Sequence, residues 1–172
     1  MDKHSKDLKV ARNILRNKMR HMDFPPKFDI NEWNSDMAKI EYLNCYAYAM
    51  GFDIPIPDQR IWGYLGWTDG HFDASTDKIA INRFMKDVRA MGRKIQITKN
   101  ENVSRKGYKV GLYINSKGSF HFIRQEREGF WTEKDGYGGK VQIITDDKGK
   151  TLNPSEFSMD EMELVSLFEI TR

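Results

Sequence analysis

Residues 108–134 read YKVGLYINSKGSFHFIRQEREGFWTEK, and apolar and polar side chains alternate along three parts of this stretch. A period of two indicates β-strands that bury one face, and glycine-containing breaks between such runs indicate hairpin turns. The stretch therefore predicts strands at 108–115, 119–125 and 129–134. Turns at 116–118 and 127–129 would join these strands into an antiparallel sheet.

More strands are expected on both sides of this stretch. Residues 94–98 and 140–145 also alternate, and residues 164–171 are rich in β-branched and apolar side chains, which favours a last strand. The segment from Ser158 to Glu161 matches a capping box and could begin a short helix, but the strand pattern that follows it is stronger.

Helical patterns fill the first half of the chain. Apolar side chains recur at helical spacing over 5–22 and 32–51, and a third helix is expected over 75–92, with its first residue as the N-cap. The second pattern breaks at Asn44, a favoured N-cap residue, so a new helix is expected to begin at Cys45. Helices followed by an antiparallel sheet indicate an α+β fold, with the N-terminal helices packed on the sheet.

The chain is expected to divide at Pro25-Pro26, because proline lacks an amide hydrogen and ends a helix. We expect a basic N-terminal helix over 1–24 and a main α+β domain over 28–172. Basic side chains outnumber acidic ones in the first segment, so it could dock on a partner.

Composition restricts the classes of function. The chain has 172 residues, 39% of them hydrophobic and 31% charged, which indicates one globular domain and excludes a disordered chain. A net charge of +3 is mild, so nucleic-acid binding is not expected. No apolar run could span a membrane or act as a secretory signal, and one cysteine excludes an internal disulfide. We expect a cytoplasmic location, which would be the host cytoplasm if a phage encodes the chain.

Cys45 is a candidate nucleophile. A cysteine reacts as its thiolate, so its site must stabilise negative charge. The first turn of a helix capped by Asn44 offers a helix dipole and backbone amides that could also face an oxyanion. Among the four histidines, His121 is the preferred base, because a strand would hold it more rigidly than a loop would hold His71. A lone cysteine on an apolar helix is more commonly a buried hydrophobic residue, so spacing alone does not establish an active site.

Other parts of a site are less defined. Residues 52–74 predict a long loop rich in glycine and proline, in which Trp62, Tyr64 and Trp67 could line a substrate groove or a partner surface. One cysteine and scattered histidines give no metal-ligand spacing, so neither a metal nor a cofactor is expected.

Two segments resemble those of a known group of proteins. Residues 44–51, NCYAYAMG, resemble the "NCYAYALG" segment of bacterial, phage and viral proteins regarded as papain-like or NlpC-like cysteine hydrolases. Residues 119–136, SFHFIRQEREGFWTEKDG, are similar to the "DYHFYRQDxxGxWSHKPG" of that family. The similarity runs from about residue 42 to the C-terminus. The resemblance implies a papain-like α+β fold with Cys45 as the nucleophile and His121 as its base.

One departure from the family concerns the third member of a triad. The family's SHK is TEK here, so Glu133 stands where the family has histidine, and a carboxylate can orient an imidazole. A three-residue hairpin loop centred on Arg127 would place Glu133 opposite His121. A two-residue turn would place Lys134 there and indicate an inactive enzyme. Asp135 is a second candidate for the orienting group.

The sequence leaves two main functions open, and NlpC-like analogy alone adds peptidoglycan cleavage as a third. In the first, the protein is a cysteine peptidase, amidase or acyltransferase of the thiol protease type, which acts on a peptide or protein substrate through Cys45 and His121. In the second, an inactive papain-like scaffold binds and inhibits a protein target, for example as a phage anti-defence factor. An activated Cys45 distinguishes the two. The sequence specifies neither the substrate or target nor the oligomeric state.

Overall fold

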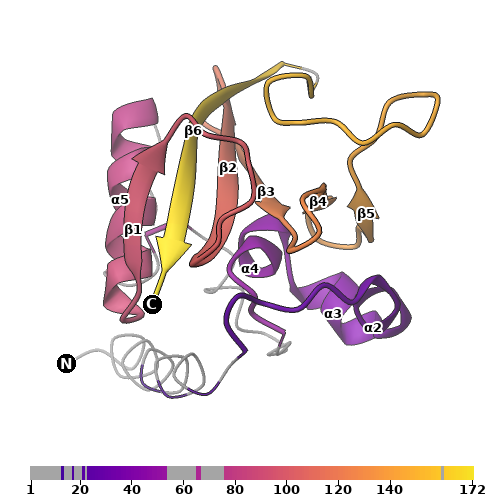
Figure 1. The fold of residues 1–172 in the computed structure, drawn as a ribbon, viewed down its shortest axis with the longest axis horizontal. Helices are drawn as coiled ribbons and strands as arrows, with labels where there is room; N and C mark the ends of the chain where they lie inside the picture. Colours follow the sequence, from indigo (N-terminus) through magenta and orange to yellow (C-terminus); the bar gives the residue numbers. More distant parts are fainter. Residues whose placement is uncertain are drawn as a thin grey trace.

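The computed structural model describes residues 13, 17, 21, 23–53, 65–66, 76–159 and 161–172. The described residues form four named helices and one six-stranded sheet (Figure 1). The helices are α2 (Ile30–Ser35), α3 (Met37–Tyr42), α4 (Cys45–Ala49) and α5 (Asp77–Ala90). The strands are β1 (Lys94–Thr98), β2 (Gly107–Asn115), β3 (Phe120–Gln125), β4 (Trp131–Lys134), β5 (Val141–Ile143) and β6 (Met162–Thr171).

The sheet has the order β1-β6-β2-β3-β4-β5, and every neighbouring pair is antiparallel. The last strand, β6, lies between β1 and β2 and joins β1 to the rest of the sheet (Figure 1). Helices α2 to α4 precede the sheet in the sequence, and α4 and α5 pack on its strands. The prediction of an α+β fold with an antiparallel sheet is therefore confirmed.

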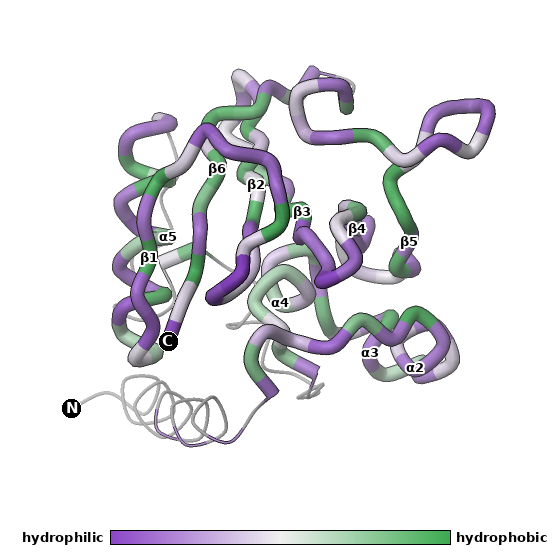
Figure 2. Tube along the Cα trace, in the orientation of Figure 1, coloured by the Kyte–Doolittle hydropathy of each residue, from purple (hydrophilic) through white to green (hydrophobic). Residues whose placement is uncertain are grey.

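One face of the sheet packs against α4 and α5. The ring of Phe84 on α5 lies 4.8 Å from that of Phe122 and 4.9 Å from that of Phe168, measured between centroids. Tyr46 on α4 contacts both Phe84 and Phe122 edge to face. Figure 2 shows α5 alternating between hydrophobic and hydrophilic residues, as expected of a helix with one buried face. Burial of these large rings supplies much of the apolar area that stabilises the fold.

The opposite face is covered by the segment between β5 and β6. Leu152 and Phe157 from this segment pack against a second buried cluster, which includes Tyr113, Ile123 and Trp131. The hydroxyl of Tyr113 also donates a hydrogen bond to a backbone carbonyl of the segment, at 3.0 Å. Both faces of the central strands are therefore buried.

Helix α4 has only five residues and is held by contacts with β3 and β4. A helix this short is unstable alone in water. Arg124 Nη1 on β3 donates to the carbonyl of Tyr48 at 2.9 Å, and Arg124 Nε donates to the Glu126 carboxylate at 2.8 Å. The Tyr48 hydroxyl donates to Thr132 Oγ1 on β4 at 2.8 Å. This buried group, which we call the Arg124 network (Tyr48, Arg124, Glu126 and Thr132), attaches the helix to the sheet.

Several predicted boundaries differ from the structure. The pattern over 32–51 is divided into three helices, because the Asp36 side chain accepts amide hydrogen bonds that begin α3 and Asn44 begins α4. The N-cap of α5 is Thr76 rather than Ser75. No helix begins at Ser158, since the amide of Met162 bonds to the carbonyl of Met159 in a turn that leads into β6.

Most of the basic helix predicted over 1–24 lies outside the described residues. Phe24 is described, and its ring packs on Tyr108 at 5.7 Å. In the described part of the chain, no helix has both the length and the apolar character needed to cross a membrane.

The Arg124 network can be tested by stability measurements. Replacing Arg124 by Met should lower the free energy of unfolding by about 3–5 kcal/mol, because the Glu126 carboxylate would stay buried without its cation. The matched control is Lys150→Met, which removes an exposed pair with Glu156 and should cost about 0.5 kcal/mol or less. Urea unfolding measures both losses. Equal losses in the two variants would contradict the assigned role of Arg124.

Candidate active site

Cys45 is the first residue of α4 and is only 4% exposed. The Asn44 side chain accepts a hydrogen bond from the amide of Ala47 at 3.1 Å, which caps the helix as predicted. The position of Cys45 is thus set by a local cap and by the packing of α4 on the sheet.

The structure brings His121 and Glu133 together beside this cysteine. His121 Nε2 lies 2.7 Å from Glu133 Oε2, and both side chains are buried. The Cys45 side chain lies close enough to the His121 ring to raise its pKa. Glu133 engages Nε2 of the ring and leaves Nδ1 clear of the carboxylate. The three residues predicted as nucleophile, base and orienting group therefore form one contiguous group.

The predicted register of the β3–β4 hairpin is wrong. The loop comprises residues 127–129 and is centred on Glu128, because Gly129 with φ +100° takes the last loop position. As a result Glu133 pairs with Ile123 rather than with His121. Residues two apart on a strand share a face, so Glu133 reaches His121 along the diagonal.

His121 lies beyond the end of the β3–β4 ladder. The last pair of that ladder is Ile123 with Glu133, and on its other side His121 pairs with Tyr113 of β2. Beyond the last pair no described β4 residue is bonded beside His121. This position leaves the ring within reach of Glu133, the last paired residue on its face of β4.

The charges of His121 and Glu133 stabilise each other. Burial lowers the pKa of His121, but hydrogen bonds and charge interactions with Cys45 and Glu133 outweigh burial and raise the pKa to about 10. Burial raises the pKa of Glu133, but hydrogen bonds from His121 and Gln142 outweigh it and leave the pKa below its ordinary value. At neutral pH the pair is therefore an imidazolium beside a carboxylate.

Gln142 is a member of the site that sequence analysis missed. Its Nε2 donates to Glu133 Oε1 at 2.8 Å, and the two residues face each other across β4 and β5. The predicted strand over 140–145 contained Gln142, but only the register between strands could reveal its partner. Gln142 and His121 together occupy both carboxylate oxygens of Glu133 and fix its orientation.

Lys134 does not lie opposite His121, so the alternative based on a two-residue turn is wrong. Its Nζ donates to the carbonyls of Ile40 at 3.0 Å and Gly136 at 2.7 Å. Burial lowers the pKa of Lys134 to about 8, against opposing attraction from Cys45 and Asp135. The described contacts thus relate Asp135 to Lys134 rather than to His121.

Helix α4 is short for the predicted dipole effect. A macrodipole needs aligned peptide groups, and α4 supplies only five residues.

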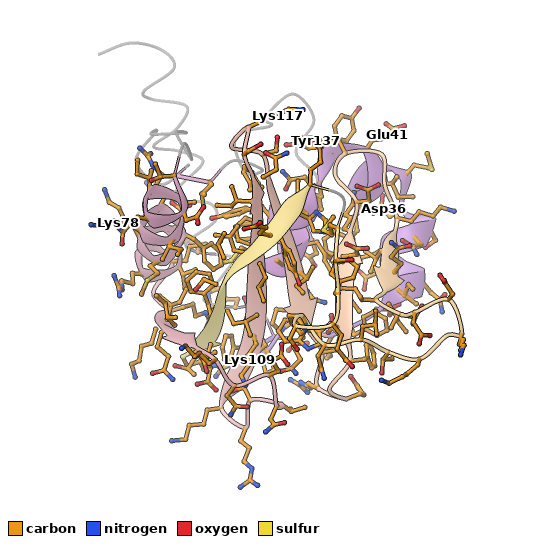
Figure 3. All side chains as sticks on the ribbon, turned by 90° about the horizontal axis from the view of Figure 1, so that it is seen from above. Asp36, Glu41, Lys78, Lys109, Lys117 and Tyr137 are labelled. Carbon is orange, nitrogen blue, oxygen red and sulfur yellow. The ribbon has the colours of Figure 1, made fainter. Side chains whose placement is uncertain are left out.

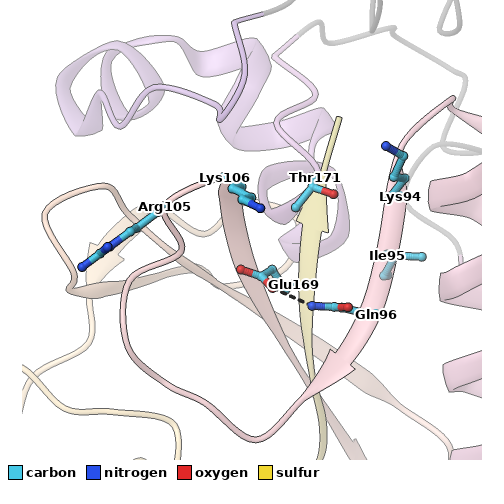
Figure 4. A pocket seen from close by; sticks show the side chains of 7 residues that line it. All are labelled: Lys94, Ile95, Gln96, Arg105, Lys106, Glu169 and Thr171. Atoms are coloured by element: carbon cyan, nitrogen blue, oxygen red, sulfur yellow. Dashed lines mark hydrogen bonds between the residues drawn. The ribbon is translucent and has the colours of Figure 1, made fainter.

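Other predicted features lie elsewhere. Trp62, Tyr64 and Trp67 are outside the described residues. Within the described part of the chain, no three His, Cys, Asp or Glu side chains are grouped so that they could hold a metal ion. A cleft between β1, β6 and the loop before β2 is lined by Arg105, Lys106 and other residues (Figure 4). Its lining includes none of Cys45, His121 and Glu133.

The raised pKa of His121 predicts a pH-dependent contribution to stability. The stabilisation is fully present below the ordinary histidine pKa of about 6.5 and is lost as pH rises through about 10. The difference in unfolding free energy between wild type and His121→Asn should therefore shrink from pH 6 to pH 10. Urea unfolding at a series of pH values measures it, and a constant difference would contradict the ion pair.

Comparison with known proteins gives one finding. A search of curated proteins and a search of solved structures each found no match. A family model described as "Domain of unknown function (DUF7689)" matches residues 32–152, which include Cys45, His121, Glu133 and Gln142. The match spans more than half of the chain, and the protein belongs to the DUF7689 family of domains of unknown function.

Proposed function

We propose that the protein is a cysteine hydrolase or acyltransferase of papain-like type, acting on an amide, peptide or isopeptide bond. Cys45 is the nucleophile, His121 the general acid and base, and Glu133 the group that orients the ring. The observation that carries this proposal is the His121 ring, held at 2.7 Å by Glu133 and close enough to Cys45 for the two side chains to interact. A nucleophile, a base and an orienting group within contact is the arrangement that nucleophilic catalysis requires.

The proposed reaction begins with the Cys45 thiolate and the His121 imidazolium. The sulfur attacks the carbonyl carbon and forms a C–S bond, while the carbonyl electron pair moves to oxygen near the first-turn amides of α4. The C–N bond then breaks, and His121 gives its proton to the leaving amine. Water attacks the thioester as His121 accepts a proton, and the acid leaves as the C–S bond breaks. An amine in place of water would make the same site a transferase.

Burial of the nucleophile supports a second candidate function. Cys45 is 4% exposed, and three clefts lined by described residues include neither Cys45 nor His121. A scaffold with an unreactive thiol would act by binding a protein target instead. The two functions differ in the ionisation of the sulfur, which can be measured without a substrate.

The first test is the ultraviolet absorbance of the thiolate against pH. Cys45 is the single cysteine, so the difference between wild type and Cys45→Ala reports on this sulfur alone and needs no reagent to reach it. An isolated thiol is less than about 1% ionised at pH 6. We expect a clear thiolate signal in the wild type at pH 6 and its loss in His121→Ala.

An ordinary thiol titration at about pH 8.5 in both the wild type and His121→Ala would overturn the hydrolase proposal and favour the binding scaffold. In that case Cys45→Ala should keep target binding.

The role of Glu133 is tested by Glu133→Gln. This change keeps an oxygen near His121 but removes the negative charge that favours the imidazolium, so the thiolate titration should move to higher pH by about one unit. Glu156→Gln, at an exposed carboxylate outside the site, is the control and should keep the wild-type profile. Overlapping profiles for the two variants would show that Glu133 does not tune His121.

A further inference from the structure

We propose that Lys134 is a positioning residue of this site: it fixes the backbone around Cys45 and supplies a second positive charge to the sulfur, beside that of His121. The inference rests on the proposed function and deepens it. No sequence pattern marked Lys134 for this role, because a lysine at the end of a strand is ordinarily exposed to solvent.

Strand register directs Lys134 toward the start of α4. Thr132 on β4 contacts Tyr48 near the end of α4. Phe122 on β3 contacts Tyr46, which lies two residues closer to the start of α4, with 5.3 Å between ring centroids. Lys134 lies two residues beyond Thr132 on the same face of β4, so it continues this progression to the end of α4 that carries Cys45.

The lysine nitrogen joins the helix that precedes Asn44 to the loop after β4. It donates to the carbonyl of Ile40, which also accepts from the amide of Gly138 at 2.9 Å, and to the carbonyl of Gly136. Ile40 belongs to α3, which ends two residues before Asn44, while Gly136 and Gly138 belong to the loop after β4. These bonds hold α3 and the loop together.

The charge of Lys134 lacks a close carboxylate in the described part of the chain. Its side chain is 1% exposed, and no described carboxylate oxygen lies within the 4.0 Å that defines an ion pair. The charged groups that interact with it are Cys45 on α4 and Asp135 in the following loop. Electrostatic coupling is reciprocal, so an ammonium favoured by a Cys45 thiolate favours that thiolate equally.

The chain contains a matched control lysine. Lys109 is also buried, and its Nζ also donates to two loop carbonyls, those of Asn100 and Asn102. Figure 3 shows Lys109 on the opposite side of the molecule from Tyr137, which lies in the loop that Lys134 holds. Lys109 therefore shares the structural role of Lys134 without the nearby sulfur.

The test compares Lys134→Gln with Lys109→Gln, since glutamine keeps a donor but removes the charge. Lys134→Gln should move the thiolate titration to higher pH by about one unit, and Lys134→Arg, which keeps the charge, should stay near the wild-type profile. Lys109→Gln should keep the wild-type profile. A wild-type profile in folded Lys134→Gln, or equal shifts in both glutamine variants, would overturn the inference. If His121→Ala removes the thiolate signal and Lys134→Gln leaves the thiolate titration unchanged, only the inference fails. If neither variant changes the titration, the proposed function fails.

A second measurement needs no lysine variant. The side-chain nitrogen of Lys134 can be titrated by NMR in the wild type and in Cys45→Ala. Removal of the sulfur should shift the Lys134 titration to lower pH, because the ammonium loses an attractive neighbour, and should leave Lys109 unchanged. Identical Lys134 titrations in the two proteins would overturn the inference.

Discussion

The candidate site depends on strand β3, which holds both ends of a helix too short to be stable alone. Arg124 bonds to the carbonyl of Tyr48 at the end of α4, and His121 on the same strand meets Cys45 at its start. Because only two residues lie between His121 and Arg124 on one strand, the distance between base and nucleophile is set by the sheet. A scaffold of this kind can hold reacting groups more precisely than a loop can.

The second constraint is electrostatic. Gln142, Glu133, His121 and Cys45 form a continuous series of polar contacts from β5 to α4, and Lys134 approaches the sulfur from β4. Each charged member would be unfavourable if buried alone. Their alternating signs outweigh burial at His121 and Glu133, so the charged state of each group depends on its neighbours. Such mutual dependence explains why substitutions at this site are expected to change titration as well as stability.

Much of this arrangement could be predicted from local sequence. Alternation gave the sheet, and the N-cap at Asn44 placed Cys45 at the start of a helix. The partnership of His121 with Glu133 was predicted with the wrong register, because moving the centre of a three-residue loop by one position, from Arg127 to Glu128, changes which residues pair. The Arg124 network and the contacts of Lys134 could not be predicted, since they join segments up to 94 residues apart and leave no periodic pattern.

The proposed site requires an ion pair between His121 and Cys45. Nitrogen-15 NMR of the histidine rings at pH 8 tests this pair most directly, since neutral and protonated imidazoles have different nitrogen shifts. Both nitrogens of His121 should be protonated in the wild type, given a pKa of about 10, and Cys45→Ala should lower this pKa. A neutral His121 ring at pH 8, with the same titration in both proteins, would contradict the ion pair.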